Sequence, residues 1–364
     1  MRWIKMKRKK EKKKKIRKRK IFYFIFLAFI LVIELAKLDD DKKINYLLEE
    51  NSIREEKIVV ANKREYYLNI RGRDRTKPIL LFLHGGPGVP MTNSMRRYQL
   101  PFEDDFVVVN WDQFYTGKSY GLNKNKKIIS MEDSVEDLDE IIRILKRDLK
   151  QEDLVVVGFS YGTILGVNYI NKYENNISAY IGVGQSTNYK REDLEGYKRA
   201  RDLSSSLLGR SFLDWTIRRI EKDKRPIFKG LAQLIKYQKL SYEKRLNVFQ
   251  NIWYSLTSSY YGIMDNFSLV ASQLNRSQSA LKKYMKEDFD IEDRKNYQLP
   301  IIFISGAHDY LSSKDLVKTY YDSLETSYKS YRLIEKAGHS PFKESPRQTY
   351  LMIKEEAYRA LALD

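Results

Sequence analysis

The chain has 364 residues, with 67 Lys and Arg against 48 Asp and Glu, and 42% of its residues are hydrophobic. This apolar content is that of ordinary globular proteins, which excludes disorder along the whole chain. The absence of cysteine excludes disulfides, thiolate metal sites, a cysteine nucleophile and a lipidated cysteine anchor. The chain has three histidines, His84, His308 and His339, so a three-histidine zinc site would have to use all of them.

The net charge of +19 is concentrated at the amino terminus. Residues 1–20 hold 14 Lys and Arg and one Glu, whereas the rest of the chain holds 53 basic and 47 acidic side chains. The body of the chain is therefore only mildly basic. A basic segment can bind nucleic acid, but this one continues directly into an apolar segment, so we expect no nucleic-acid partner.

The apolar segment is long enough to cross a membrane. Residues 21–33 are apolar or aromatic throughout, and only Glu34 and Lys37 interrupt the 18 residues from Ile21 to Leu38. A transmembrane helix needs about 20 residues, or about 17 at the short end. Because Lys and Arg stay on the cytoplasmic side, we predict an anchor at residues 21–38, with residues 1–20 in the cytoplasm and the rest outside the cell membrane.

Two alternatives to the anchor remain. A cleaved signal peptide, which would give a secreted protein, has the same basic start and a similar apolar core. Its cleavage site would be poor here, because Glu34 lies two positions before Ala36. The other alternative is an amphipathic or disordered tail on a membrane surface. The charged residues 39–54 are predicted to form a linker or a short spacer helix.

Short apolar segments then alternate with helical patterns. Continuous hydrophobicity over four or five residues is typical of strands that are buried on both faces. Such segments occur at residues 79–83, 106–109, 154–157, 180–183 and 301–304. Two further strands are expected near residues 58–60 and 66–70. A helix is expected after Ser130, which with Asp133 resembles a capping box. A last helix is expected with Ser345 as its N-cap and Pro346 at its first position. This alternation predicts an α/β fold with a mostly parallel, doubly wound sheet.

Residues 189–298 interrupt the alternation. They are rich in charged and aromatic residues, show no buried strand pattern, and contain helical stretches near 208–222 and 228–250. We therefore predict a helical cap at residues 189–298, inserted between the two core segments 55–188 and 299–364.

Gly158-Phe-Ser-Tyr-Gly162 lies between a predicted strand and a helix expected at residues 163–173. This is the G-x-S-x-G nucleophile elbow in its strand–turn–helix context. The sharp turn strains the serine backbone, and side chains two positions away would collide. Ser160 is thus the predicted nucleophile.

A serine nucleophile needs a base, and the base needs an orienting acid. In this fold the chain order is serine, acid, histidine. Asp309 follows the predicted strand at residues 301–304, and His339 follows a further strand expected at residues 331–334, at the sheet edge where sites collect. His84 precedes the serine and His308 adjoins the acid, so His339 is the predicted base and Asp309 the acid. More distant candidates for the acid are Asp288, Asp290 and Asp293.

His84-Gly-Gly-Pro-Gly88 directly follows the first buried strand. Its glycines allow backbone N–H groups to face the site, and we expect those of Gly86 and Tyr161 to bind an oxyanion. A phosphate-binding loop is disfavoured because the Lys-Ser/Thr of a P-loop is missing. His84 is expected to hold the loop.

Three motifs together resemble the proline iminopeptidase branch of the α/β-hydrolases. They are residues 84–88, Asn110-Trp-Asp-Gln113 with Gly117-Lys-Ser119, and residues 158–162. The resemblance covers about residues 55–362. It implies an α/β-hydrolase fold, a triad of Ser160, Asp309 and His339, oxyanion donors at Gly86 and Tyr161, and a helical cap that recognises the free amino terminus of a short peptide.

The chain departs from that family at three places. The usual Asp-Gln-Arg-Gly reads Asp112-Gln-Phe-Tyr115, so a supporting arginine is missing. Phe159 stands where a small residue or histidine is common. The carboxylates that would bind the peptide amine are not assigned, and the candidates are Glu192, Glu195, Glu221 and Glu243.

These features predict a membrane-tethered serine hydrolase that acts as an aminopeptidase on short peptides through an acyl-enzyme, with no metal or organic cofactor. Relatives that cleave epoxides or haloalkanes use aspartate as the nucleophile, so Ser160 disfavours them. One alternative is a carboxylesterase with an aromatic pocket. Its lining could come from Trp215, Trp253, Tyr254, Tyr260 and Tyr261. Another alternative is a non-catalytic surface binding protein on the same scaffold.

Overall fold

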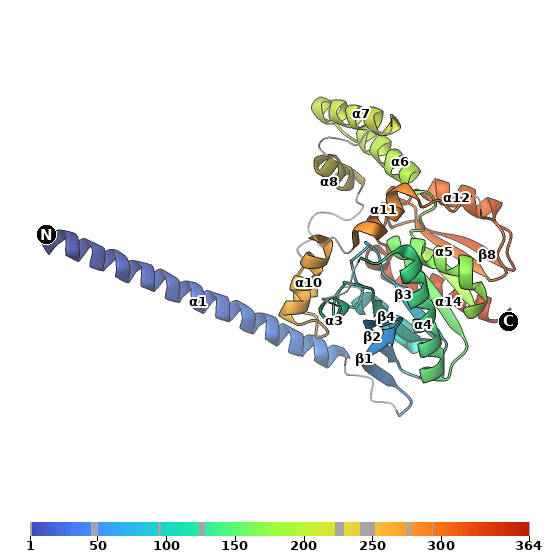
Figure 1. The fold of residues 1–364 in the computed structure, drawn as a ribbon, viewed down its shortest axis with the longest axis horizontal. Coiled ribbons are helices and arrows are strands. Elements are labelled where there is room, and N and C mark those ends of the chain that lie inside the picture. Colours follow the sequence, from blue (N-terminus) through green and yellow to red (C-terminus); the bar gives the residue numbers. More distant parts are fainter. Residues whose placement is uncertain are drawn as a thin grey trace.

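The computed structural model describes residues 2–44, 50–93, 96–123, 128–222, 229–240, 252–274, 278–292 and 294–363. Its centre is an eight-stranded sheet in the order β1-β2-β4-β3-β5-β6-β7-β8 (Figure 1). The strands are β1 Ile53–Ala61, β2 Arg64–Gly72, β3 Ile79–Leu83, β4 Val107–Asp112, β5 Leu154–Phe159, β6 Ala179–Val183, β7 Ile301–Gly306 and β8 Lys329–Ile334. Strands β1 and β2 form an antiparallel hairpin, β2 pairs antiparallel with β4, and all later pairs are parallel. The predicted mostly parallel sheet is confirmed.

The central strands are buried on both faces. In β3, Leu81 pairs with Val109 of β4 on one side and with Val156 of β5 on the other. Every residue of β3 and β6 is buried. Successive side chains along a strand point to opposite faces, so a strand with helices on both faces has no polar side. This explains the unbroken apolar segments of the sequence.

Helices cover the two faces of the sheet. One face packs against α4 Met131–Leu149, α5 Tyr161–Tyr173, α11 Ser279–Glu287 and α12 Lys314–Ser323. The other face packs against the 3-10 helix η1 Leu100–Asp104, α13 Pro341–Glu344 and α14 Pro346–Leu361. Three shorter elements lie in the connections: α2 Arg96–Gln99, α3 Ser119–Leu122 and η2 Glu174–Asn176.

Of the two predicted helix caps, the one at α4 is present and the one at α14 is not. At α4 the capping box is present, because Ser130 Oγ accepts from the Asp133 N–H at 3.0 Å and Asp133 Oδ2 accepts from the Ser130 N–H at 3.0 Å. Helix α14 begins at Pro346 as expected, but Ser345 makes no capping bond. Its hydroxyl donates instead to the Lys336 carbonyl at 2.8 Å.

Helices fill the connection between β6 and β7. They are α6 Tyr189–Asp202, α7 Leu207–Glu221, α8 Lys229–Leu240, α10 Ile263–Leu274 and α11. Helices α6, α7 and α8 share a small apolar cluster of their own, which includes Tyr197 and Leu213, and they stand away from the sheet (Figure 1). The predicted helix 208–222 corresponds to α7. Of the predicted helix 228–250, α8 covers the first half and residues 241–251 lie outside the described part.

Helix α1 spans Arg2–Ile44 and projects from the domain (Figure 1). It contains a segment, Lys13–Asp40, that by length and composition could cross a membrane. The helix is longer than the expected 21–38, because it also includes the basic segment and the first residues of the predicted linker. Its last turns contact the domain, since Ile33 is 3% exposed and Asp40 is 6% exposed.

Candidate active site

Ser160 lies at a sharp turn between β5 and α5. Its backbone has φ 53° and ψ −119°, a conformation that non-glycine residues rarely adopt. The Ser160 N–H donates to the Val183 carbonyl at the end of β6 at 3.1 Å. This bond places the serine at the carboxyl edge of the sheet, where open α/β sheets form their sites.

The two glycines of the motif are required by close approach. A Cβ atom on Gly162 would lie 2.0 Å from the Leu83 carbonyl oxygen, and one on Gly158 would lie 2.8 Å from the Gly162 carbonyl oxygen. The helix start can therefore approach β3 only when these side chains are missing, which gives the G-x-S-x-G pattern its physical reason.

The structure brings the three predicted residues together. His339 Nε2 lies 2.9 Å from Ser160 Oγ, and His339 Nδ1 lies 2.9 Å from Asp309 Oδ2. The other carboxylate oxygen, Asp309 Oδ1, accepts from the N–H groups of Leu311 at 2.9 Å and Ser312 at 3.0 Å. In such a chain of groups the imidazole can take the hydroxyl proton while the carboxylate stabilises its charge.

The alternative acids do not take part in this chain of groups. Asp290 accepts from the Asn188 amide at 2.6 Å, and Asp288 is exposed. Asp293 lies outside the described residues.

His339 is partly shielded from solvent. Its side chain is 19% exposed, and the Phe159 ring lies 5.6 Å from the imidazole, centre to centre. Burial opposes a charge on His339, but the carboxylate of Asp309 outweighs it, so the pKa of His339 is raised above 6.5. Phe159, which departs from the family pattern, thus packs against His339.

Glu344 holds the loop that carries His339. Its Oε2 accepts from the Gly338 N–H at 2.7 Å and from the Ser340 N–H at 3.3 Å. The two donors flank His339, so this carboxylate orients the backbone on both sides of the ring. Sequence reasoning missed Glu344, because nothing in the short segment after His339 distinguishes it from a surface glutamate.

The glycine-rich loop lies against the serine. A Cβ atom on Gly85 would come within 3.3 Å of Ser160 Cβ, and Gly86 adopts φ +122°. Tyr161 is the first residue of α5, and the first N–H groups of a helix have no intrahelical acceptor. The residue before Gly86 thus contacts Ser160, and Tyr161 directly follows Ser160 at the start of the helix.

The buried side chain of His84 fixes the glycine-rich loop through its hydrogen bonds, as expected. Its Nε2 accepts from the Gln113 N–H at 3.2 Å, and its Nδ1 lies 2.9 Å from the Gly85 carbonyl. The ring is 1% exposed, and burial lowers the pKa of His84 to about 4. A neutral ring fits these two bonds, with Nδ1 donating and Nε2 accepting.

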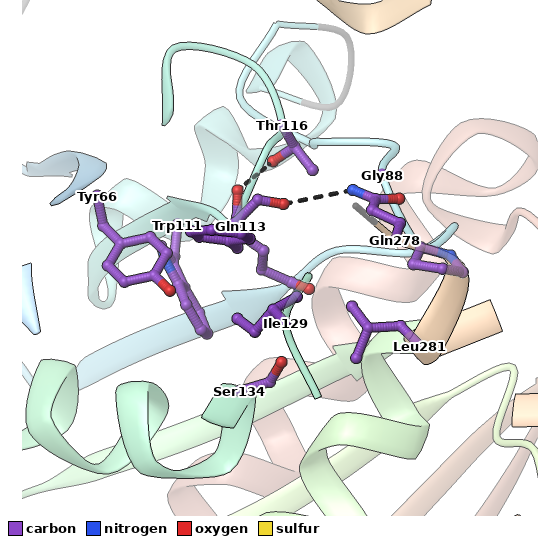
Figure 2. Close-up of a pocket in the computed structure, with 11 residues that line it drawn as sticks. Tyr66, Gly88, Trp111, Gln113, Thr116, Ile129, Ser134, Gln278 and Leu281 are labelled. Carbon is purple, nitrogen blue, oxygen red and sulfur yellow. Dashed lines mark hydrogen bonds between the residues drawn. The ribbon is translucent and has the colours of Figure 1, made fainter. Parts of the chain in front are cut away.

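Figure 2 shows the space below this loop, where Gln113 and Thr116 lie between Tyr66 and Trp111 on one side and Gln278 and Leu281 on the other. The cavity measures only about 10 Å³. That is at most the space of one water molecule. The space between these side chains is therefore too small to hold a substrate.

A buried carboxylate occupies the segment that lacks the usual arginine. Asp112 accepts from Thr92 Oγ1 at 2.7 Å, from the Lys118 N–H at 2.9 Å and from the Tyr261 hydroxyl. Burial raises the pKa of Asp112 to about 6. Hydrogen bonds from neutral side chains and from the backbone thus connect the loop after β3, which carries Thr92, with the loop after β4, which carries Lys118, around this carboxylate.

Glu192 on α6 is buried against the segment that follows β6. It is 2% exposed, and it accepts from Ser186 Oγ and from the Thr187 N–H, both at 2.7 Å. Burial raises the pKa of Glu192 to about 7, and the charges of Asp309 and His339 are close enough to affect it.

The other predicted cap carboxylates lie elsewhere. Glu195 and Glu221 are about half exposed and both face Lys198, at 3.8 and 3.7 Å. Glu243 is outside the described residues. The described part of the chain contains no group of three His, Asp or Glu side chains that could hold a metal ion.

Comparison with known families and structures adds to this geometry. The model of the family described as serine aminopeptidase, S33, matches residues 75–346. The chain belongs to this family. One relative is the probable aminopeptidase YbaC of Bacillus subtilis (strain 168). The two sequences are 28% identical over 306 residues, which cover 82% of this chain and 94% of that protein.

Two solved structures share the fold. The proline iminopeptidase-related protein TTHA1809 of Thermus thermophilus has a TM-score of 0.61 at 16% identity, with 86% of this chain and 100% of that chain covered. A membrane phospholipase A has a TM-score of 0.62 at 13% identity, with 94% and 99% covered. These structures show the α/β-hydrolase fold, and the family match identifies the serine-hydrolase type.

Proposed function

We propose that this chain is a serine aminopeptidase that acts on short peptides with a free amino terminus. Ser160 Oγ attacks the carbonyl carbon of the first residue, and His339 Nε2 takes its proton. Asp309 stabilises the imidazolium, and the N–H groups of Gly86 and Tyr161 bind the oxyanion. His339 then gives the proton to the leaving amine, and water releases the acyl-enzyme. The observation that carries the proposal is the pair of 2.9 Å contacts of His339.

The choice of an aminopeptidase rests on the family match and on Glu192. An enzyme that binds a protonated amine needs a carboxylate close to its nucleophile. Among the described cap carboxylates that sequence analysis named, Glu192 alone is both buried and electrostatically coupled to His339. A cationic amine beside Glu192 would hold it in the charged form despite its burial.

Glu192→Gln tests this role. On a prolyl chromogenic amide with a free amine, we expect KM to rise about 10–100-fold, the range for losing one buried charge-assisted bond. On a short acyl ester, which has no amine, kcat/KM should change less than about threefold. Glu195→Gln is the matched control and should leave both substrates unaffected. Equal losses on both substrates would contradict amine recognition.

The same variant changes the pH profile. A general base is active when neutral, so kcat/KM should fall as pH drops through the raised pKa of His339. Glu192 contributes to that rise by stabilising the imidazolium. Without its charge, the acid limb of kcat/KM measured on the ester should move to lower pH. An unchanged limb would show that Glu192 does not act on His339.

A lipid or small carboxylester is the second candidate substrate. It is favoured by the apolar helix α1 and by the fold shared with a membrane phospholipase A over 94% of this chain. The aromatic residues expected to line an ester pocket have other contacts. Tyr261 bonds to Asp112, Tyr254 and Tyr260 stack against arginines, and Trp215 stacks on Phe212. Turnover of the ester without any turnover of the amide would favour this candidate.

We also propose that α1 anchors the enzyme with its basic end in the cytoplasm and the hydrolase domain outside. In spheroplasts, added protease should then degrade the domain and leave a stub that contains α1. Addition of detergent provides the control for protease activity. Full protection of the domain in intact spheroplasts would contradict this orientation.

A further inference from the structure

The end of α1 is held by a buried cluster of charges. Asp40 forms ion pairs with Arg96 and, at 3.1 Å, with Arg97, and it accepts from the Ser259 N–H at 3.0 Å. Arg96 is 2% exposed and lies over the Tyr260 ring, 4.8 Å from its centre. The contact fixes α1 to the loop after β3 and to the segment before α10.

Around Asp40 alone the positive charges outnumber the negative ones, and Asp39 adds a second carboxylate at the adjoining cavity. Two guanidinium groups face the single carboxylate of Asp40, and the neighbouring Arg71 is paired with Glu103 at 2.7 Å. Within the described residues, Arg96 Nε and Nη1 are buried and have no hydrogen-bond acceptor. The ring of Tyr260 stabilises the cation, but it does not satisfy N–H donors in the way an oxygen does. A buried donor without an acceptor destabilises the folded state.

A cavity of about 300 Å³ is lined in part by Arg96 and Arg97. Its lining comes from the end of α1, from α2 and η1, and from the segment before α10: Ala36, Asp39, Asp40, Arg96, Arg97, Leu100, Trp253 and Thr257. This volume is at the lower end of the range for small-molecule sites. The cavity is separate from the small space below the glycine-rich loop, with which it shares no lining residue.

The position of the cavity along α1 indicates what it faces. The predicted anchor ends at Leu38, and the cavity is lined by Ala36 and Asp39, which lie on either side of that end. At about 1.5 Å per residue both lie within roughly 3 Å of the end of the anchor along the helix axis. The polar layer of a bilayer extends about 5–8 Å beyond the hydrocarbon core on each side. Trp253, which is 39% exposed, also suits this depth, because Trp concentrates at membrane interfaces.

We propose that this cavity binds the phosphate of a phospholipid head group, with Arg96 and Arg97 donating to its oxygens. The inference rests on the proposed membrane anchor and not on the proposed peptidase activity. Asp39 on the same cavity carries the opposite charge, so a head group with an amine beside its phosphate fits better than a purely anionic one. A lipid bound here fixes the depth and tilt of the hydrolase domain relative to the bilayer.

The test measures binding to the full-length chain in a non-ionic detergent. All proteins carry Ser160→Ala, so that no lipid is hydrolysed. The probes are a short-chain phosphatidylethanolamine, the diacylglycerol of equal chain length, and inorganic phosphate. The readouts are the thermal unfolding temperature and the number of lipids retained in native mass spectrometry. We expect phosphatidylethanolamine to raise the unfolding temperature with one lipid retained, and diacylglycerol to have no effect.

Two variants should weaken this binding about tenfold or more. Arg96→Gln removes one positive charge. Ala36→Phe fills the cavity and keeps every charge. A loss of binding in Ala36→Phe therefore cannot result from a folding defect caused by the loss of Arg96. Arg218→Gln, an exposed arginine on α7, is the matched control and should bind as the parent does. If inorganic phosphate raised the unfolding temperature and the lipid did not, the cavity would be an anion site whose ligand is a free anion and not a lipid. Equal protection by diacylglycerol, or binding unchanged in both variants, would overturn the proposal.

Discussion

Ser160→Ala should lower kcat by about 10⁴–10⁶-fold on any substrate that the wild type hydrolyses. Removing the nucleophile of a serine hydrolase leaves only the contributions of the oxyanion donors and of substrate binding, which explains why a small residual rate survives. The 2.9 Å contact with His339 Nε2 disappears with the hydroxyl. The measurement is turnover of the prolyl amide and the acyl ester, together with covalent labelling by a fluorophosphonate probe.

Ser178→Ala is the matched control for this experiment. Ser178 precedes β6, at the edge of the sheet opposite Ser160, and its hydroxyl accepts from the Leu154 N–H at 3.3 Å. This variant should keep its activity and its labelling. Equal labelling of the Ser160→Ala protein, or a wild type that does not label at all, would contradict the enzyme assignment and favour a binding protein on the hydrolase scaffold.

Asp309→Asn should lower kcat by about 10⁴-fold while leaving the fold intact. Asp309 Oδ1 accepts from the N–H groups of Leu311 and Ser312. In the variant, these two donors require the amide oxygen on their side, so the amide NH₂ has to face His339 Nδ1. Nδ1 must then be an acceptor, which moves the ring proton to Nε2 and prevents the ring from taking the Ser160 proton.

The measurement is kcat at saturating substrate, with the unfolding temperature as a check on folding. Asp290→Asn offers a control, because Asp290 is exposed and its partner Asn188 lies at the start of the cap. That variant should retain the activity of the wild type. A loss smaller than about tenfold for Asp309→Asn would show that another group orients His339.

Local patterns predicted much of the scaffold. The unbroken apolar segments indicated buried strands such as β3 and β6, the Ser130–Asp133 pair indicated the start of α4, and Gly158 and Gly162 indicated the turn at Ser160. The pair Ser130–Asp133 and the approach of Gly158 to Gly162 are contacts between residues close in sequence, and a buried strand is visible as an unbroken apolar segment. Such signals are visible without knowing the rest of the fold.

The sequence by itself also named Ser160, Asp309 and His339, because the α/β-hydrolase topology brings strand ends in a known order to one edge of the sheet. Only the tertiary structure decided which further side chains meet there. Glu192 and Glu344 look like any other glutamates along the chain, and Asp40 meets Arg96 across 56 positions. Glu192 and Asp40 owe their roles to burial, which makes a carboxylate's partners and charge matter, and Glu344 owes its role to its bonds with the backbone beside His339. Burial arises when distant segments pack together, so a one-dimensional pattern does not contain it.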